Sequence, residues 1–270
     1  MQLGLRLCVA RAAVLLMYSM FRSLGDRLIY YPMRYPRGAW GLQPTVAAQD
    51  RWIEAADGTK LHAWWFPKAE AHFATLFLHG NAGNVTHRVD RAQAILDAGS
   101  AFLVVDYRGY GKSHGRPGER GLYEDGDAAY GDLVRLGYAP DRIIVHGESL
   151  GTAVAVDLAI RHHCAAVILE SPLMSAGKVA GTMLPFFGPL FVHGYDTYSK
   201  ISRVQVPLLV IHGDADEIVP FSQGQNVFRA ANEPKEFWTV SGAHHNDLLD
   251  VAGTAYVARL QNFYRRLLRK

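Results

Sequence analysis

Short apolar runs alternate with longer helical segments through most of the chain after residue 50, and this alternation restricts the fold more than any other feature. The runs, which are rich in Val, Ile, Leu and Phe and lack strict apolar/polar alternation, are ATLFLHG, AFLVVDY, DRIIVHG, AAVILES, VPLLVIHG and KEFWTVSG. Such runs are typical of parallel strands that are covered on both faces. The segments around and between them predict helices at residues 85–98, 121–136, 150–163, 222–231 and 253–268. Strands that alternate with helices predict an α/β fold with a doubly wound, mostly parallel sheet.

Two local patterns add detail to this prediction. The segment RWIEAADGTKLHAWWFP places Asp57-Gly58 between two alternating runs, which indicates a β-hairpin ahead of the parallel strands. In the last predicted helix, apolar residues recur at helical spacing, so one face should pack on the sheet. These residues are Tyr256, Leu260, Phe263 and Leu267.

The composition is that of a globular chain. Of the 270 residues, 49% are hydrophobic and 20% are charged, so we expect one large domain with a sizeable core over residues 25–270. The net charge is +3, and the basic residues are spread along the chain apart from the terminal FYRRLLRK, so we expect no nucleic-acid partner. Cys8 and Cys164 lie far apart in the sequence, and no structural disulfide is expected between them.

The first 24 residues differ in character from the rest. Arg6 and Arg11 precede an apolar run from residue 12 to residue 21, as in a signal sequence, but no small-x-small cleavage site follows before Arg22. The run is shorter than the about 20 residues that a spanning helix needs. We therefore expect residues 1–24 to be an uncleaved anchor or interfacial helix that attaches an otherwise cytoplasmic protein to a membrane. The alternative is a helix that packs on the domain after it.

A candidate nucleophile follows the strand-like run DRIIVHG. Gly147, Ser149 and Gly151 form the G-x-S-x-G motif GESLG directly before a predicted helix, which is the setting that a nucleophile elbow requires. Side chains at either glycine would collide with the neighbouring strand and helix, and the helix N-terminus favours negative charge that develops beside the serine. The motif predicts a catalytic serine, with the backbone N–H of Leu150 as one oxyanion-hole donor.

A serine hydroxyl needs a base and an orienting acid, and with this elbow the acid and then the histidine follow the serine along the chain. Carboxylates follow VPLLVIHG at Asp214 and Asp216, and histidines follow KEFWTVSG at His244 and His245. Both pairs come just after predicted strands, where open α/β sheets place their functional residues. The chain order alone leaves both choices open.

Several motifs occur together along the chain, namely LHGNAGN, DYRGYGKSHG, HGESLG, IHGDADEIVP and GAHHND. With these motifs, and from Tyr30 to the C-terminal helix, the chain resembles an α/β-hydrolase of the serine-hydrolase type. It is most similar to the branch that includes membrane-associated depalmitoylase-like proteins and serine-aminopeptidase-like hydrolases.

The resemblance implies roles for particular residues. It aligns the acid with Asp216, in an H-G-x-x-D-x-x-V-P pattern, and the base with His245, in a G-x-x-H-N pattern. Asp214 and His244 remain as the alternatives. The resemblance also implies that the second oxyanion-hole donor is the backbone N–H of Asn81.

Residues 173–200 interrupt the alternation of strands and helices. The stretch is apolar, contains Gly and Pro, and has no strand pattern. Because it follows the C-terminus of a predicted strand, where ligands bind in such sheets, we expect a short cap that lines an acyl pocket. The alternative is an irregular surface helix. The substrate-contacting residues that the cap predicts are Phe186, Phe187, Leu190 and Phe191.

These features predict a serine hydrolase that cleaves small-molecule or lipid-like acyl esters or thioesters through an acyl-enzyme, without a cofactor. The sequence has no HxH, HExxH or Cys/His cluster at metal-ligand spacing, and no P-loop or dinucleotide fingerprint. Two other functions stay open. One is peptide hydrolysis, in which Glu148, Glu170 or Glu217 would recognise the substrate amine. The other is a membrane-tethered scaffold that keeps the hydrolase fold without turnover.

Overall fold

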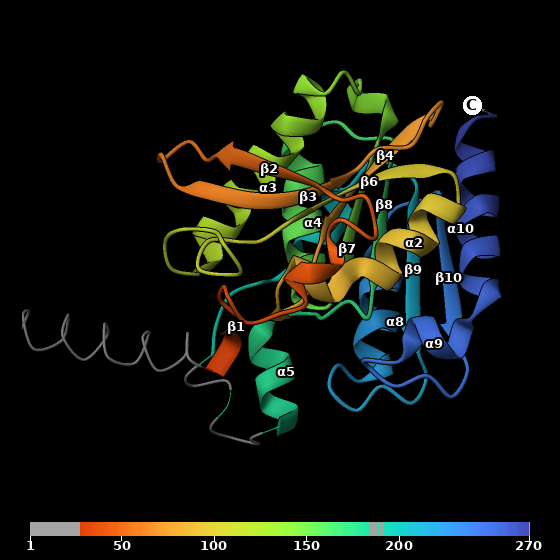
Figure 1. Ribbon diagram of the computed structural model, residues 1–270. Helices are drawn as coiled ribbons and strands as arrows, with labels where there is room; N and C mark the ends of the chain where they lie inside the picture. The colour runs from red at the N-terminus through yellow and green to blue at the C-terminus, as the bar shows by residue number, and fades with distance from the viewer. Residues whose placement is uncertain (1–27, 184–187, 189–191, 270) are drawn as a thin grey trace, which may run out of the picture.

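One sheet organises the molecule in the computed structural model, which describes residues 28–183, 188 and 192–269 (Figure 1). Its strands are β2 (Gln49–Glu54), β3 (Lys60–Phe66), β4 (Phe73–Leu78), β6 (Ser100–Val105), β7 (Ile143–Glu148), β8 (Ala166–Glu170), β9 (Leu208–Gly213) and β10 (Lys235–Val240). They form an eight-stranded sheet in the order β10-β9-β8-β7-β4-β6-β3-β2. β3 is antiparallel to both of its neighbours, and all the other neighbouring pairs are parallel. The predicted α/β class with a mostly parallel sheet is confirmed.

The apolar runs form the interior strands, and the predicted hairpin forms the edge. β4, β6, β8 and β9 are buried along their whole length, as expected for parallel strands that are covered on both faces. β2 and β3 pair from Glu54 opposite Lys60 onward, and Ala55 N–H donates to the Thr59 carbonyl to close the turn. Gly58 has a φ of 81° in this turn, a backbone conformation that glycine adopts without strain.

Helices cover both faces of the sheet (Figure 1). The α-helices of the described residues are α2 (Val89–Asp97), α3 (Glu119–Arg135), α4 (Leu150–Arg161), α5 (Ala176–Met183), α7 (Thr197–Lys200), α8 (Phe221–Ala230), α9 (Leu248–Ala252) and α10 (Thr254–Leu267). α3, α4 and α8 pack on one face, and α2, α9 and α10 pack on the other. Short 3₁₀ helices are η1 (Trp40–Leu42), η2 (Val85–Arg88), η3 (Pro140–Arg142) and η4 (Ile201–Arg203).

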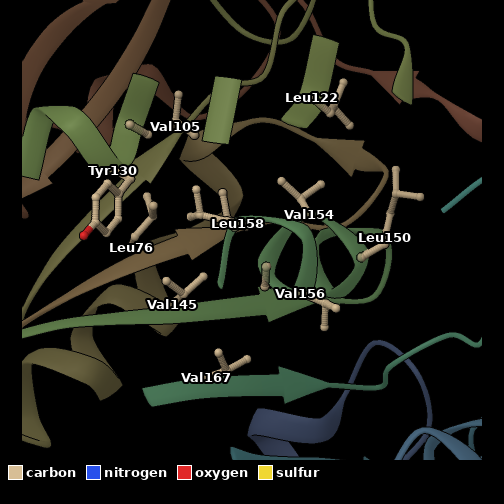
Figure 2. Packing of buried hydrophobic residues seen from close by; sticks show 14 of the residues in the cluster. Leu76, Val105, Leu122, Tyr130, Val145, Leu150, Val154, Val156, Leu158 and Val167 are labelled. Atoms are coloured by element: carbon tan, nitrogen blue, oxygen red, sulfur yellow. The ribbon is translucent and has the colours of Figure 1, made fainter. Parts of the chain in front are cut away.

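A separate buried cluster fills each of the two interfaces. On the α3/α4 face, Leu122 and Tyr130 of α3 and Leu158 of α4 lie over strand residues such as Val145, as Figure 2 shows. On the other face, α10 contributes the predicted apolar stripe: Tyr256, Leu260 and Phe263 are buried and Leu267 is partly buried. The parallel strands therefore have packed layers on both sides, which fixes the position of their carboxyl ends.

The helix predicted at residues 85–98 is two elements in the structure. The Asn84 side chain accepts a hydrogen bond from Thr86 N–H at 3.0 Å and caps η2. Arg88 then has a φ of −115° and a ψ of 14°, outside helical values, and α2 begins at Val89. The chain therefore changes direction within the predicted helix, because the residue at the junction is not helical.

The segment before β2 and the segment after β8 are less regular. A small sheet pairs β1 (Tyr31–Pro32) with β5 (Ala82–Gly83), next to Asn81. The described part of residues 173–200 contains α5 and α7. The expected anchor at residues 1–24 lies outside the described residues. Within the residues that the structure covers, no helix combines the length and apolar character needed to cross a bilayer. The expected substrate contacts Phe186, Phe187, Leu190 and Phe191 also lie outside the described residues.

Candidate active site

Ser149 lies in a tight turn between β7 and α4. Its φ is 50° and its ψ is −116°, a backbone conformation that residues other than glycine rarely adopt. A β-carbon added at Gly147 would lie 2.5 Å from the Gly151 carbonyl oxygen, and one added at Gly151 would collide with the Leu78 carbonyl. The collisions expected from the motif are therefore present. The two glycines let strand, turn and helix approach closely enough to expose the serine at the sheet edge.

The strands bring Ser149, Asp216 and His245 together. They follow β7, β9 and β10, whose carboxyl ends lie at the same edge of the sheet. His245 Nε2 lies 3.0 Å from Ser149 Oγ, and His245 Nδ1 lies 2.8 Å from Asp216 Oδ2. The three side chains thus form a continuous hydrogen-bonded series, with the separations that a nucleophile, a base and an acid have in a serine hydrolase.

Asp216 is held as a carboxylate. Its Oδ1 accepts hydrogen bonds from Ile218 N–H and Val219 N–H at 3.0 and 2.8 Å. His212 Nε2 also lies 3.2 Å from Oδ2. Burial raises the pKa of Asp216, but the hydrogen bonds from His212 and His245 lower it more, so the net pKa lies below its ordinary value. A carboxylate acceptor at Nδ1 leaves the Nε2 lone pair of His245 free to face Ser149.

The alternative acid, Asp214, and the alternative base, His244, contact groups other than Ser149. Asp214 accepts from Gly242 N–H at 2.6 Å and from Ser241 Oγ at 3.1 Å, so it connects the loop after β9 to the loop after β10. His244 Nδ1 lies 3.0 Å from Glu217 Oε2. The side chain of His244 is 58% exposed, against 10% for His245. The structure therefore brings only one member of each pair to Ser149.

The two residues predicted to supply oxyanion donors line the pocket together with the serine. Leu150 is the first residue of α4, where backbone N–H groups have no partner within the helix. Asn81 follows β4, and its side-chain Nδ2 donates to the Ile29 carbonyl at 2.9 Å. Its own carbonyl accepts from Tyr31 N–H at 3.0 Å. Both Asn81 and Leu150 line the same pocket as Ser149.

This pocket has a volume of about 310 Å³ and an apolar lining. The cap segment contributes Leu173 and several residues of α5 and beyond, which agrees with the expected cap over a pocket. Sequence reasoning missed the contributions from residues 28–31 and 218–219, since short segments without periodicity give no sign of their tertiary contacts. The lining residues are Leu28, Ile29, Tyr31, Asn81, Ser149, Leu150, Leu173, Ala176, Val179, Ala180, Gly188, Val192, Ile218 and Val219.

The glutamates considered for amine recognition already have charged partners. Glu148 lies 3.1 Å from Arg88 Nε. Burial raises the pKa of Glu148, but the charges of Arg88 and Arg91 have the larger, opposite effect, so the net pKa falls to about 2. Glu170 is 1% exposed and lies 2.9 Å from Arg91 Nη2. Glu217 pairs with His244 on the surface. In the described part of the chain, no group of three or more His, Cys, Asp or Glu side chains is arranged to hold a metal ion.

The sheet order, with β3 as its antiparallel strand and a strained serine between β7 and α4, is that of an α/β-hydrolase. The family model described as serine aminopeptidase, S33, matches residues 69–195. An uncharacterized protein of Mycobacterium tuberculosis is 38% identical over 250 residues, which are 90% of this chain and 87% of that protein. The chain belongs to the α/β-hydrolase family of serine hydrolases.

Further relatives and solved structures agree with this assignment. The alpha/beta hydrolase domain-containing protein 17C of Mus musculus is 41% identical over 204 residues, which are 72% of this chain and 60% of that protein. The Pyrococcus furiosus esterase Pf2001 superposes with a TM-score of 0.73 at 21% identity, covering 88% of this chain and 98% of the esterase. Est1E of Butyrivibrio proteoclasticus, solved with ferulic acid bound, superposes with a TM-score of 0.68 at 22% identity, covering 82% and 100%. These structures share the fold of this chain.

Proposed function

We propose that the protein cleaves carboxylic esters or thioesters through an acyl-enzyme intermediate. The observation that carries the proposal is the hydrogen-bonded chain from Ser149 through His245 to Asp216, placed at the wall of an apolar pocket. Each of these three side chains has a hydrogen-bond partner that holds it in the geometry for proton transfer. A scaffold without turnover would need neither this series of hydrogen bonds nor the strained serine backbone.

The proposed reaction follows from these positions. Ser149 Oγ attacks the carbonyl carbon while His245 Nε2 takes the hydroxyl proton, and the Asp216 carboxylate stabilises the imidazolium. The Asn81 and Leu150 N–H groups stabilise the oxyanion. Collapse of the tetrahedral intermediate breaks the bond to the leaving alcohol or thiol, which receives the proton from His245. Water then attacks the acyl-enzyme by the same route and releases the carboxylic acid.

The pocket supports a small-molecule or lipid-like acyl substrate. Its described lining holds no Asp, Glu, Lys, Arg or His side chain, so burial of an apolar acyl group leaves no unpaired charge there. Peptide hydrolysis from an N-terminus would require a carboxylate for the substrate amine. Glu148 and Glu170 are paired with arginines, which counts against this alternative.

Membrane attachment through residues 1–24 is a further part of the proposal. It is supported by the basic residues and the apolar run of that segment. Flotation with anionic vesicles tests it: the full chain should float with the vesicles, and a chain that lacks residues 1–24 should not. Equal flotation of both chains would refute the attachment.

Turnover and active-site labelling test the catalytic proposal. Wild type should hydrolyse p-nitrophenyl esters or acyl thioesters in a panel of increasing acyl length, and a fluorophosphonate probe should label it. Ser149→Ala and His245→Ala should each lower kcat by about 10⁴-fold or more. His244→Ala is the matched control and should stay close to wild type. Equal labelling of wild type and Ser149→Ala would exclude Ser149 as the nucleophile.

A further inference from the structure

The peptide group between Gly80 and Asn81 is held by a side chain. His79 Nδ1 lies 2.7 Å from the Gly80 carbonyl oxygen, which belongs to the same peptide group as Asn81 N–H. In a planar trans peptide the C=O and N–H bonds point in opposite directions. A hydrogen bond that fixes the Gly80 carbonyl therefore also fixes the direction of the Asn81 N–H, the proposed oxyanion donor.

His79 is placed so that it can only donate to this carbonyl. The residue is fully buried, and its ring packs against Tyr107 and Tyr110, with centroid distances of 4.5 and 5.3 Å. Burial, together with the charge of Arg88, lowers its pKa to about 3, so the imidazole is neutral at pH 7. A carbonyl oxygen cannot donate, so the single ring proton must be on Nδ1. Nε2 has no hydrogen-bond partner among the described residues.

Side chains other than His79 hold the peptide groups before and after the one between Gly80 and Asn81. The peptide before it is held by Tyr107, whose hydroxyl donates to the His79 carbonyl at 3.2 Å. Glu148 accepts from Gly80 N–H on that same peptide, also at 3.2 Å. The peptide after it is held by Tyr110, whose hydroxyl donates to the Asn81 carbonyl at 2.8 Å. Among the described residues, the ring of His79 is thus the side chain that holds the peptide group between Gly80 and Asn81.

We propose that His79 is a positioning residue, and that its Nδ1–H holds the Gly80 carbonyl so that Asn81 N–H faces the oxyanion formed at Ser149. The inference rests on the proposed function. It extends that function by making the oxyanion hole depend on a buried neutral histidine that never touches the substrate. Removal of the Nδ1 donor lets the peptide turn away and leaves Leu150 as the remaining aligned donor.

Substitution of His79 tests the proposal through kcat. His79→Leu removes the donor and should lower kcat for a p-nitrophenyl ester by about 10²-fold, the effect of losing one oxyanion donor, with KM changed by less than about threefold. His79→Asn places an amide N–H near the position of Nδ1 and should recover most of kcat. Tyr107→Phe is the matched control, because it removes one hydrogen bond from the same cluster but on the preceding peptide. It should stay within about threefold of wild type.

A trifluoromethyl ketone separates oxyanion binding from general packing damage. Its adduct with Ser149 carries an oxyanion, so its affinity for His79→Leu should fall by the same factor as kcat/KM. The proposal is overturned if His79→Leu keeps wild-type kcat. It is also overturned if His79→Asn is as slow as His79→Leu, or if the ketone binds His79→Asn and His79→Leu equally well.

The protonation state of His79 gives a test on the wild-type protein that requires neither turnover nor a stable variant. Nitrogen-15 NMR of histidine-labelled protein at pH 7, with the His79 signal assigned by its loss in His79→Asn or by its contacts to the Tyr107 ring, should show the proton on Nδ1. A proton on Nε2 would overturn the proposal. If wild type shows no turnover while Nδ1 carries the proton, the proposed function fails and the hydrogen bond remains.

Discussion

Ser149 combines a backbone conformation that costs about 1–3 kcal/mol with a side chain that must face the pocket. Strand β7 before it and helix α4 after it impose this conformation, because both are packed in the core. The turn was predictable from the sequence, because it requires glycine at positions 147 and 151. The collision at Gly147 involves Gly151, which is close in sequence and can be predicted from a short motif, whereas the collision at Gly151 involves Leu78 of the neighbouring strand β4.

The choices between Asp214 and Asp216 and between His244 and His245 could not be made from residue chemistry. The two residues of each pair carry the same side chain, and they differ only in the direction in which their loop points that side chain. That direction depends on contacts between loops, such as the hydrogen bond from Gly242 N–H to Asp214. Resemblance to known hydrolases made the choice that the geometry also favours, but the catalytic roles stay predictions.

The lowered pKa of Asp216 predicts a pH-dependent contribution to stability. The unfolded-state pKa of an aspartate is about 3.9, and the folded-state pKa is lower, so the carboxylate stabilises the fold fully above about pH 5. This contribution is lost as the pH falls from about 4 through the folded-state pKa. Asp216→Asn should therefore be less stable than wild type by about 1–3 kcal/mol at pH 7, with a difference that shrinks below about pH 4.

Urea unfolding at a series of pH values measures this difference. Asp141→Asn, at an exposed position, is the control and should follow wild type throughout. A constant difference between wild type and Asp216→Asn from pH 7 to pH 3 would contradict the assignment of the shift to Asp216.

At the scale of elements, the strands and helices with clear periodicity were predictable, and the pocket walls were not. The predicted helix at 150–163 is α4 (Leu150–Arg161), and the one at 253–268 is α10 (Thr254–Leu267). The pocket, in contrast, is built from α5 and from residues 28–31, which lie far apart in sequence. Their contact depends on tertiary packing, which leaves no periodic pattern in the sequence.

Helix α5 provides a prediction about substrate binding. Val179→Asp introduces a carboxylate into the apolar wall, and its desolvation should raise KM for an apolar acyl ester by about 10-fold or more. Thr182→Asp is the matched control, since it adds the same charge to the same helix at an exposed position. Steady-state kinetics on esters of increasing acyl length would measure both. Equal KM values for the two variants would show that this face of α5 does not contact the acyl group.

At the scale of the whole molecule, a buried ionic cluster joins elements that lie far apart in the sequence. Arg91 of α2 pairs with Glu170 of β8 at 2.9 Å, and Glu170 also lies 2.7 Å from His146 Nε2 of β7. The hydroxyl of Tyr256 in α10 donates to the same carboxylate. The Glu170 side chain is 2% exposed, so its charge depends on these partners rather than on water.

Loss of the cationic partner should destabilise the whole fold. Arg91→Met leaves the Glu170 carboxylate buried without its arginine and should lower the free energy of unfolding by about 3–5 kcal/mol. The double variant Arg91→Met/Glu170→Gln should recover part of this loss. Arg259→Met, which breaks a pair with Glu236 whose side chains are 30% and 31% exposed, should cost less than about 1 kcal/mol. Urea unfolding would measure all of these, and a cost for Arg91→Met no larger than for Arg259→Met would refute the prediction.

The pocket lining includes residues 28–31 and described residues of the cap segment, which lie far apart in the sequence. The hydroxyls of Tyr30, within the first of these segments, and Tyr195, within the second, lie 2.7 Å apart. Under the proposed function, acyl preference should therefore not be transferable by exchange of the cap alone. A chimera that takes α5 from a related hydrolase would combine a foreign wall with the native residues 28–31. Under the proposed function, transfer of specificity between such enzymes should require both segments together with Tyr30 and Tyr195.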